Sequence, residues 1–330
     1  SFTEDILALD TPYAPIPVYN DEGWNVETPP QNADTSFNDA SFYVVRVTAP
    51  ARLKLVATGV EVSRDESNDT QVVTYEQGPA RDFFLAASPD YVTTTQAVGE
   101  TRINTFARPG EDKGQAVALD AAAKALTDYN QRFGPYPYTE LDVAATPMLA
   151  LGIEYPGAVG ISERLYQPDY QPPTGSADVV VESTVAHELA HQWFYNLVGS
   201  DQIDQPWLDE AMAQYSTWLY FVDRYGATAG DAVKANWNGR WDRIDREKTP
   251  VGLPARAYAE REYSPIVYGR GPLFLTALAE RMGQSTFDRF LKDYSARFRW
   301  GIATTEDFKA LADKACNCDL SDLYREWLDL

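Results

Sequence analysis

The chain has 330 residues, 44% of them hydrophobic and 13% aromatic, which is enough for a large core and excludes a disordered protein. The 49 acidic side chains outnumber the 28 basic ones, so the net charge is −21 and the surface repels nucleic-acid phosphates. We therefore expect no nucleic-acid partner. The same charge would favour cationic small molecules, including those with a free amino group, and solubility alone is the alternative explanation. No apolar run reaches the roughly 18–20 residues of a transmembrane segment, and no signal peptide opens the sequence.

Residues 1–107 carry the pattern of β-structure, after a proline-rich and irregular opening of thirty residues. Short runs of β-branched and aromatic residues alternate with turn residues, at 41–48, 53–58, 71–75, 82–87, 91–96 and 101–106. Ala-Arg-Pro-Gly at 107–110 interrupts this pattern and is typical of a linker. We predict an N-terminal antiparallel β domain over 1–107 and a second domain over 108–330.

The second domain begins with a helix and a small sheet. Residues 115–133 are alanine-rich with helical spacing and end before Gly134, while 141–146 and 149–161 have the pattern of strands. Further helices are predicted at 182–198, 206–225, 229–247, 267–282, 285–298, 304–315 and 321–329. The pattern therefore predicts an α+β fold whose C-terminal part is mainly helical.

The two cysteines, Cys316 and Cys318, are too few and too close for a disulfide framework. We interpret them as ordinary residues of a helix end and the following loop. A metal site or a strained bridge is the alternative.

The only two histidines fall four residues apart, in His187-Glu188-Leu-Ala-His191. On a helix this spacing places both rings on one face, close enough to bind one ion at about 2.0–2.1 Å. Glu188 lies about 100° further round the helix, where it is poorly placed as a ligand and well placed beside a bound water. Chance gives this arrangement about once in a few thousand sequences, so we favour a metal site over two core histidines.

A third ligand is predicted at Glu210, eighteen residues beyond His191 and near the start of the next helix. Its neighbour Asp209 is a competitor that spacing alone does not reject. Two imidazoles and one carboxylate suit one Zn²⁺ per chain with an open position for water. Zinc lowers the pKa of that water to roughly 7. Glu188 then serves as the general base that takes the proton and passes it to the leaving amine.

These residues resemble the motif of one family. The segment from His187 to Gly199, followed by Trp-Leu-Asp-Glu at 207–210, resembles the aminopeptidase N and leukotriene hydrolase family, gluzincin zinc peptidases with the pattern HExxH-x18-E. Segments 79–83, 133–138 and 319–328 also look like parts of that family. The resemblance implies a thermolysin-like catalytic domain over 108–330. It also implies a β domain that is truncated, lacking its first strands, and no further C-terminal helical domain.

The resemblance implies further site residues. Glu154, in Leu-Gly-Ile-Glu-Tyr, matches the family acid that binds the α-ammonium group of the substrate. Gly152 lies on the same strand and is a second candidate for substrate binding. Leu151, Ile153 and Tyr155 stand at the positions where the family motif has glycine, methionine and asparagine. An ordinary acid in an edge strand is therefore the alternative for Glu154. Tyr268, in Tyr-Gly-Arg-Gly, matches the tyrosine that stabilises the oxyanion, with arginine in place of lysine. Tyr263 is a candidate for lining the site.

The sequence thus predicts a zinc-dependent aminopeptidase acting on peptides with a free N-terminus. A thermolysin-type endopeptidase is one alternative, because it shares the zinc ligands and the general base. A truncated, catalytically weak peptide-binding module is the other. The acidity and the scarcity of lysine slightly favour a secreted or cell-surface location over the cytoplasm.

Overall fold

The computed structural model describes residues 2–3, 5–20, 23–30, 36–173 and 175–329. The chain forms two compact units, each built from separate stretches of sequence. The first comprises Ser1–Pro15, Ala40–Thr127 and Tyr136–Gln192, and the second comprises Ile16–Asp39, Asp128–Pro135 and Trp193–Leu330. These units divide the chain at points other than residue 107, and the domain boundary expected there stays a prediction.

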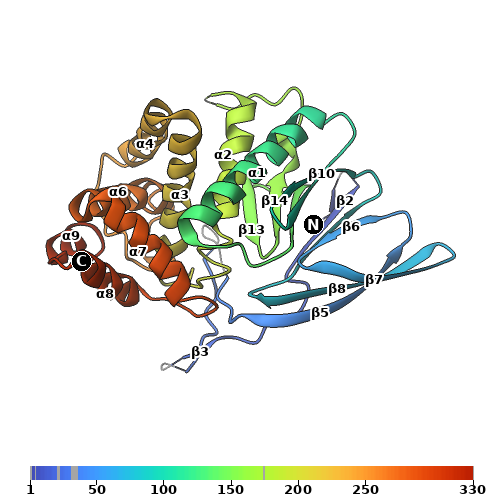
Figure 1. Ribbon diagram of the computed structural model, residues 1–330, viewed down its shortest axis with the longest axis horizontal. Helices are drawn as coiled ribbons and strands as arrows, with labels where there is room; N and C mark the ends of the chain where they lie inside the picture. Colours follow the sequence, from blue (N-terminus) through green and yellow to red (C-terminus); the bar gives the residue numbers. More distant parts are fainter. Residues whose placement is uncertain (1, 4, 21–22, 31–35, 174, 330) are drawn as a thin grey trace. The chain divides into compact units, whose positions relative to one another are not determined.

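Two antiparallel sheets of the first unit share a core (Figure 1). One has the strand order β1-β2-β9-β6, with bounds Phe2–Thr3, Ile6–Asp10, Phe84–Ser88 and Lys54–Ala57. The other has the order β5-β8-β7, with bounds Ser41–Pro50, Thr70–Ala80 and Val60–Ser67. Side chains from both sheets, including Val73 and Leu85, pack in one buried cluster. Strand β5 alternates more and less exposed residues, as expected for a strand with one face on a core, whereas β9 is buried throughout.

A five-stranded sheet of the first unit carries the edge strand of interest. Its order is β10-β11-β12-β14-β13, with bounds Val92–Val98, Thr101–Ala107, Glu140–Thr146, Ala158–Ser162 and Gly152–Tyr155. Strands β11 and β12 run parallel because helix α1 (Asp112–Phe133) connects them. The single strand predicted over 149–161 is wrong. Gly157, at φ +74°, reverses the chain and makes β13 and β14 an antiparallel pair.

Helix α2 (Ala177–Ala190) packs against β13 and β14 (Figure 1). Ser176 begins it, because its hydroxyl accepts the backbone N–H of Val179. The predicted helix over 182–198 is wrong at both ends. Beyond Ala190 the backbone turns, since Tyr195 has φ +139° and the N–H of Val198 donates to the carbonyl of Trp193. A positive φ at a residue other than glycine is strained and incompatible with an α-helix.

The second unit is mainly helical, as the sequence predicts. Its helices are α3 to α9, with bounds Trp207–Tyr225, Ala227–Asp242, Tyr263–Pro265, Gly271–Met282, Gln284–Arg297, Thr305–Cys316 and Ser321–Trp327. Strand β3 (Tyr19–Asn20) pairs antiparallel with β4 (Gly23–Trp24). In the core, the ring of Trp207 lies 5.7 Å from that of Phe274 and 5.0 Å from that of Phe308. A π-helix, Ile266–Arg270, stands where the start of the helix predicted over 267–282 was expected.

Two further features concern the helices. Cys316 and Cys318 form a disulfide at the end of α8, which corrects their interpretation as ordinary residues. Among helices in the described part of the chain, none combines the length and the apolar character needed to cross a membrane. The mixture of sheets and helices confirms the α+β class.

Candidate active site and metal centre

Helix α2 presents both histidines on the same face. Their Nε2 atoms lie 3.3 Å apart, and their ring planes cross at 86°. His191 is only 1% exposed, so its ring is held by the packing around the end of the helix. The apolar neighbours Val185, Ala186 and Leu189 are fully buried and fix the rotation of α2 in the first unit. The histidine separation therefore follows from the helix itself.

This separation fits a bound zinc ion. Two ligands of a tetrahedral ion, each about 2.0–2.1 Å from it, lie about 3.3 Å from one another. The observed distance between the two Nε2 atoms is the same. Neither ring needs to move far to bind a metal, so the pair is suited to zinc.

Glu188 lies against the beginning of strand β13. The carboxylate is buried, and a Cβ atom added to Gly152 would stand 2.4 Å from its Oε1 atom. That approach is too close for a real Cβ, so any larger residue at position 152 would displace the Glu188 carboxylate. The sequence identifies Gly152 only through its place on the strand. The structure adds that it makes room for Glu188.

Glu154 lies on the same strand as Gly152 and close to the second histidine. It is 8% exposed, and one of its carboxylate oxygens lies within 4.8 Å of a ring nitrogen of His191. The first unit therefore brings together all five predicted residues that it contains: Gly152, Glu154, His187, Glu188 and His191.

The second unit contains Glu210, in the first turn of α3. The neighbouring carboxylate of Asp209 accepts hydrogen bonds from Gln202 Nε2 at 2.5 Å and from the backbone N–H of Glu210 at 2.8 Å. The Glu210 carboxylate instead accepts the hydroxyl of Tyr268 at 2.5 Å. The two acids are therefore distinguished by their partners, which spacing alone could not achieve. Asp209 holds the start of the helix together, and this favours Glu210 as the ligand.

Tyr268 comes from the π-helix, a rare element that often occurs at functional sites. Its ring lies 6.1 Å from the ring of Tyr263 and 5.7 Å from the guanidinium of Arg240. Burial lowers the pKa of Arg240. The second unit thus brings together its three predicted residues, Tyr263, Tyr268 and Glu210, in one chain of contacts.

Arg270, two residues after Tyr268, has a structural role. It is buried, and its guanidinium donates to the carbonyls of Thr249 and Glu326. It also stacks on the ring of Trp327, 4.9 Å from the centroid. This arginine, which stands where the family motif has lysine, therefore fastens helix α9 to the loop around Thr249.

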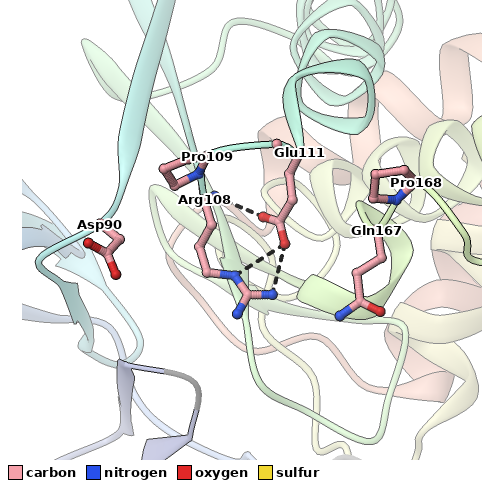
Figure 2. A pocket seen from close by; sticks show the side chains of 7 residues that line it. Asp90, Arg108, Pro109, Glu111, Gln167 and Pro168 are labelled. Atoms are coloured by element: carbon pink, nitrogen blue, oxygen red, sulfur yellow. Dashed lines mark hydrogen bonds and ion pairs between the residues drawn. The ribbon is translucent and has the colours of Figure 1, made fainter.

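A surface pocket of about 420 Å³ lies elsewhere in the first unit (Figure 2). Glu111 accepts the backbone N–H and the guanidinium of Arg108 at 2.8 and 2.9 Å, and so closes the beginning of α1. None of the residues predicted for the metal centre or for catalysis lines this pocket, whose lining is Asp90, Arg108, Pro109, Gly110, Glu111, Gln167 and Pro168. The pairing of Arg108 with Glu111 before the helix accounts for two of its charged groups.

Known proteins resemble this chain in sequence and in fold. Aminopeptidase M1-B of Oryza sativa subsp. japonica is 27% identical over 306 residues, covering 86% of this chain and 34% of that protein. Aminopeptidase 2, mitochondrial, of Saccharomyces cerevisiae is 27% identical over 316 residues, covering 87% and 31%. The chain thus spans about a third of the length of these curated relatives.

Solved structures give the same result. The M1 zinc metallopeptidase of Deinococcus radiodurans has a TM-score of 0.72 at 26% identity, covering 88% of this chain and 64% of that one. A mutant of it was solved with a Tyr-Ser-Ala substrate, at 25% identity and the same TM-score. The peptidase family M1 domain matches residues 117–327, well over half of the sequence and including both histidines. The chain therefore belongs to peptidase family M1.

Proposed function

We propose that this chain is a zinc-dependent aminopeptidase that hydrolyses the first peptide bond of peptides with a free N-terminus. One observation carries the proposal. In the first unit, two histidine Nε2 atoms stand at a zinc-binding separation, with Glu188 next to one of them in sequence and Glu154 beside the other in space. Membership of a family with zinc metallopeptidase neighbours implies Zn²⁺ as the cofactor.

The ligands proposed for this ion are His187, His191 and Glu210. Two neutral imidazoles and one carboxylate leave a fourth position open, as catalytic zinc sites do. When bound, the ion supplies a Lewis acid that activates water and polarises the substrate carbonyl. The donor set and the 3.3 Å separation of the histidine nitrogens support this assignment.

The remaining residues divide the reaction among them. Glu188 takes the proton of the attacking water and returns it to the nitrogen of the leaving amine. Glu154 binds the α-ammonium group of the substrate by a charge-assisted hydrogen bond. Edge strand β13 offers backbone groups to an extended peptide, with Gly152 at its start and Tyr263 lining the other part of the site. Tyr268 donates its hydroxyl to the oxygen on which charge develops in the transition state.

Glu188→Gln tests the central step. We expect the rate on an aminoacyl-coumarin substrate to fall at least about a hundredfold, within the roughly 10²–10⁴ contribution of a general base, while zinc stays bound. Activity of the wild type should disappear with a chelator and return with zinc. Glu182→Gln is the matched control, since Glu182 is a buried acid of the same helix. Equal rates in the two variants would reject Glu188 as the base.

N-acetylated peptides separate an aminopeptidase from an endopeptidase. If Glu154 binds the free amine, acetylation removes that charge and the substrate is no longer cleaved. Continued cleavage of the blocked peptide would favour an endopeptidase. Full zinc occupancy without turnover of any aminoacyl substrate would favour a peptide-binding module.

A further inference from the structure

Gln192 follows the second histidine directly and has no part in the chemistry proposed above. Its side chain is 1% exposed and uses both ends of its amide. Oε1 accepts the backbone N–H of Gly157 at 2.9 Å, and Nε2 donates to the backbone carbonyl of Tyr155 at 2.9 Å. One side chain therefore bridges the two sides of a turn 35 residues away in sequence.

That turn fixes the end of strand β13. Among the described strands, β13 pairs only with β14, so its other edge has no strand beside it. The carbonyl of Gly157 accepts the N–H of Asp142 at 2.9 Å, which ties the turn to the sheet. Gln192 ties the same turn to the end of α2. Strand β13 thus passes close to Glu188 near its start and is hydrogen-bonded to Gln192 at its end.

Glu154 lies between these two contacts. Its carboxylate reaches to within 4.8 Å of a ring nitrogen of His191, the residue that precedes Gln192 in the chain. A shift of β13 along α2 would change the spacing between Glu154 and His191. That spacing decides how far from the substrate amine the cleaved bond lies.

We propose that Gln192 is a positioning residue that sets the distance between the amine-binding carboxylate of Glu154 and the metal-binding end of α2. The inference rests on the proposed function, since it takes Glu154 as the group that binds the amine. The N–H of Gly157 needs an acceptor and the carbonyl of Tyr155 needs a donor, and a side-chain amide of this length supplies both. Glutamate keeps the length and loses the donor to Tyr155. Methionine keeps the approximate volume and loses both hydrogen bonds.

Hydrogen–deuterium exchange tests the attachment without any need for catalysis. In Gln192→Met we expect amide exchange over residues 152–157 to become at least about tenfold faster, because lost buried hydrogen bonds permit local opening. Gln115→Met is the matched control. Gln115 is also buried in the first unit, and its Nε2 donates to the carbonyls of Val92 and Thr105 at 2.8 and 2.9 Å. Equal exchange of 152–157 in both variants and the wild type would overturn the proposal.

Steady-state kinetics test the positioning role. In zinc-loaded Gln192→Met we expect kcat for an aminoacyl-coumarin substrate to fall about tenfold, because the cleaved bond is displaced when the amine-binding carboxylate shifts, with KM within about threefold of the wild type. Gln192→Glu should show a smaller fall in the same direction, and Gln115→Met none. Zinc content should remain one ion per chain in each variant.

Three outcomes would contradict the role of Gln192. A rise in KM with unchanged kcat, a loss of zinc, or the same kinetics in Gln192→Met and Gln115→Met would each show that Gln192 does not position Glu154. A wild type that cleaves no free-amine substrate would instead reject the proposed function. The exchange comparison would then still decide whether Gln192 holds β13.

Discussion

The candidate residues of the two units are held in different ways. In the first unit, the helical spacing of His187, Glu188 and His191 brings both rings to one side, where their Nε2 atoms lie 3.3 Å apart. In the second unit, Glu210 has its carboxylate held by Tyr268, which lies 58 residues further along the chain. The first part is therefore specified by sequence spacing, whereas the second depends on a tertiary hydrogen bond. Substitutions in each part should show this difference.

The largest effect is expected from removing a metal ligand in either part. His191→Ala and Glu210→Ala should both lose the bound zinc and reduce activity to background, because a three-ligand site with one ligand missing binds the ion weakly. Atomic emission on purified protein measures the zinc. Asp209→Asn is the control and should keep its zinc, since its partners are Gln202 and a backbone N–H. Zinc retained by Glu210→Ala and lost by Asp209→Asn would identify Asp209, and not Glu210, as the third metal ligand.

Tyr268→Phe sharpens the comparison within the second part. We expect kcat to fall about 10²–10³-fold with zinc affinity little changed, as for the loss of one oxyanion donor. A fall of about 10–100-fold in zinc affinity would instead show that the hydroxyl mainly orients Glu210. Competition with a fluorescent chelator distinguishes the two. Tyr258→Phe controls for the loss of a buried hydroxyl in the same unit.

Gly152→Ala should have a smaller effect, confined to the first part. The added Cβ would stand 2.4 Å from Glu188 Oε1, so the carboxylate must shift. We expect kcat to fall about tenfold with zinc still bound, since small misplacements of reacting groups reduce rates by one to two orders of magnitude. Gly239→Ala, where a Cβ meets nothing within 4 Å, is the control. An unchanged kcat in Gly152→Ala would show that Glu188 has room to move.

The smallest effect concerns stability alone. Burial raises the pKa of Asp142, on β12, well above its usual range. The folded state therefore favours the protonated acid. The contribution of Asp142 to the free energy of unfolding is fully present below about pH 3.9 and is lost as the pH rises through the folded-state pKa. Asp142→Asn should match the wild type near pH 4 and be more stable by about 1–3 kcal/mol near pH 8.

Urea denaturation at a series of pH values measures the effect of Asp142→Asn. Asp231→Asn, at an exposed position of α4, should show no such trend. A gap between Asp142→Asn and the wild type that is constant with pH would contradict burial of a titrating carboxyl. Zinc binding should be the same in all three proteins, because the histidine spacing does not depend on this sheet position.

The sequence was sufficient where the structure is local. The four-residue spacing of the histidines predicts their common face, and alternating or helical patterns predict the order of strands and helices. The prediction failed where one backbone angle decides the path. Gly157 at φ +74° divides a predicted strand in two, and Tyr195 at φ +139° follows a helix predicted to continue to residue 198. The apolar periodicity of the sequence continues through both positions and carries no information about the backbone angle φ.

Long-range partners were the other part that the sequence could not supply. Tyr268 is one of 20 tyrosines, and nothing in its neighbours indicates a bond to Glu210. Gln192 reads as a polar residue at the end of a motif, although its amide joins a turn 35 residues away. The preference for Glu210 over Asp209 likewise depends on a partner distant from the motif, since Gln202 donates to the carboxylate of Asp209.

The interleaving of the two units limits how the protein can be dissected. The chain enters the second unit at residue 16, leaves it at 40, returns at 128, leaves at 136 and enters finally at 193. A recombinant fragment beginning at 193 would lack Asn25, Glu27 and Ser36, which contact Asp201, Arg256 and Gln202 within that unit. No single chain break separates the two units. Three separate fragments would therefore have to associate to rebuild the second unit.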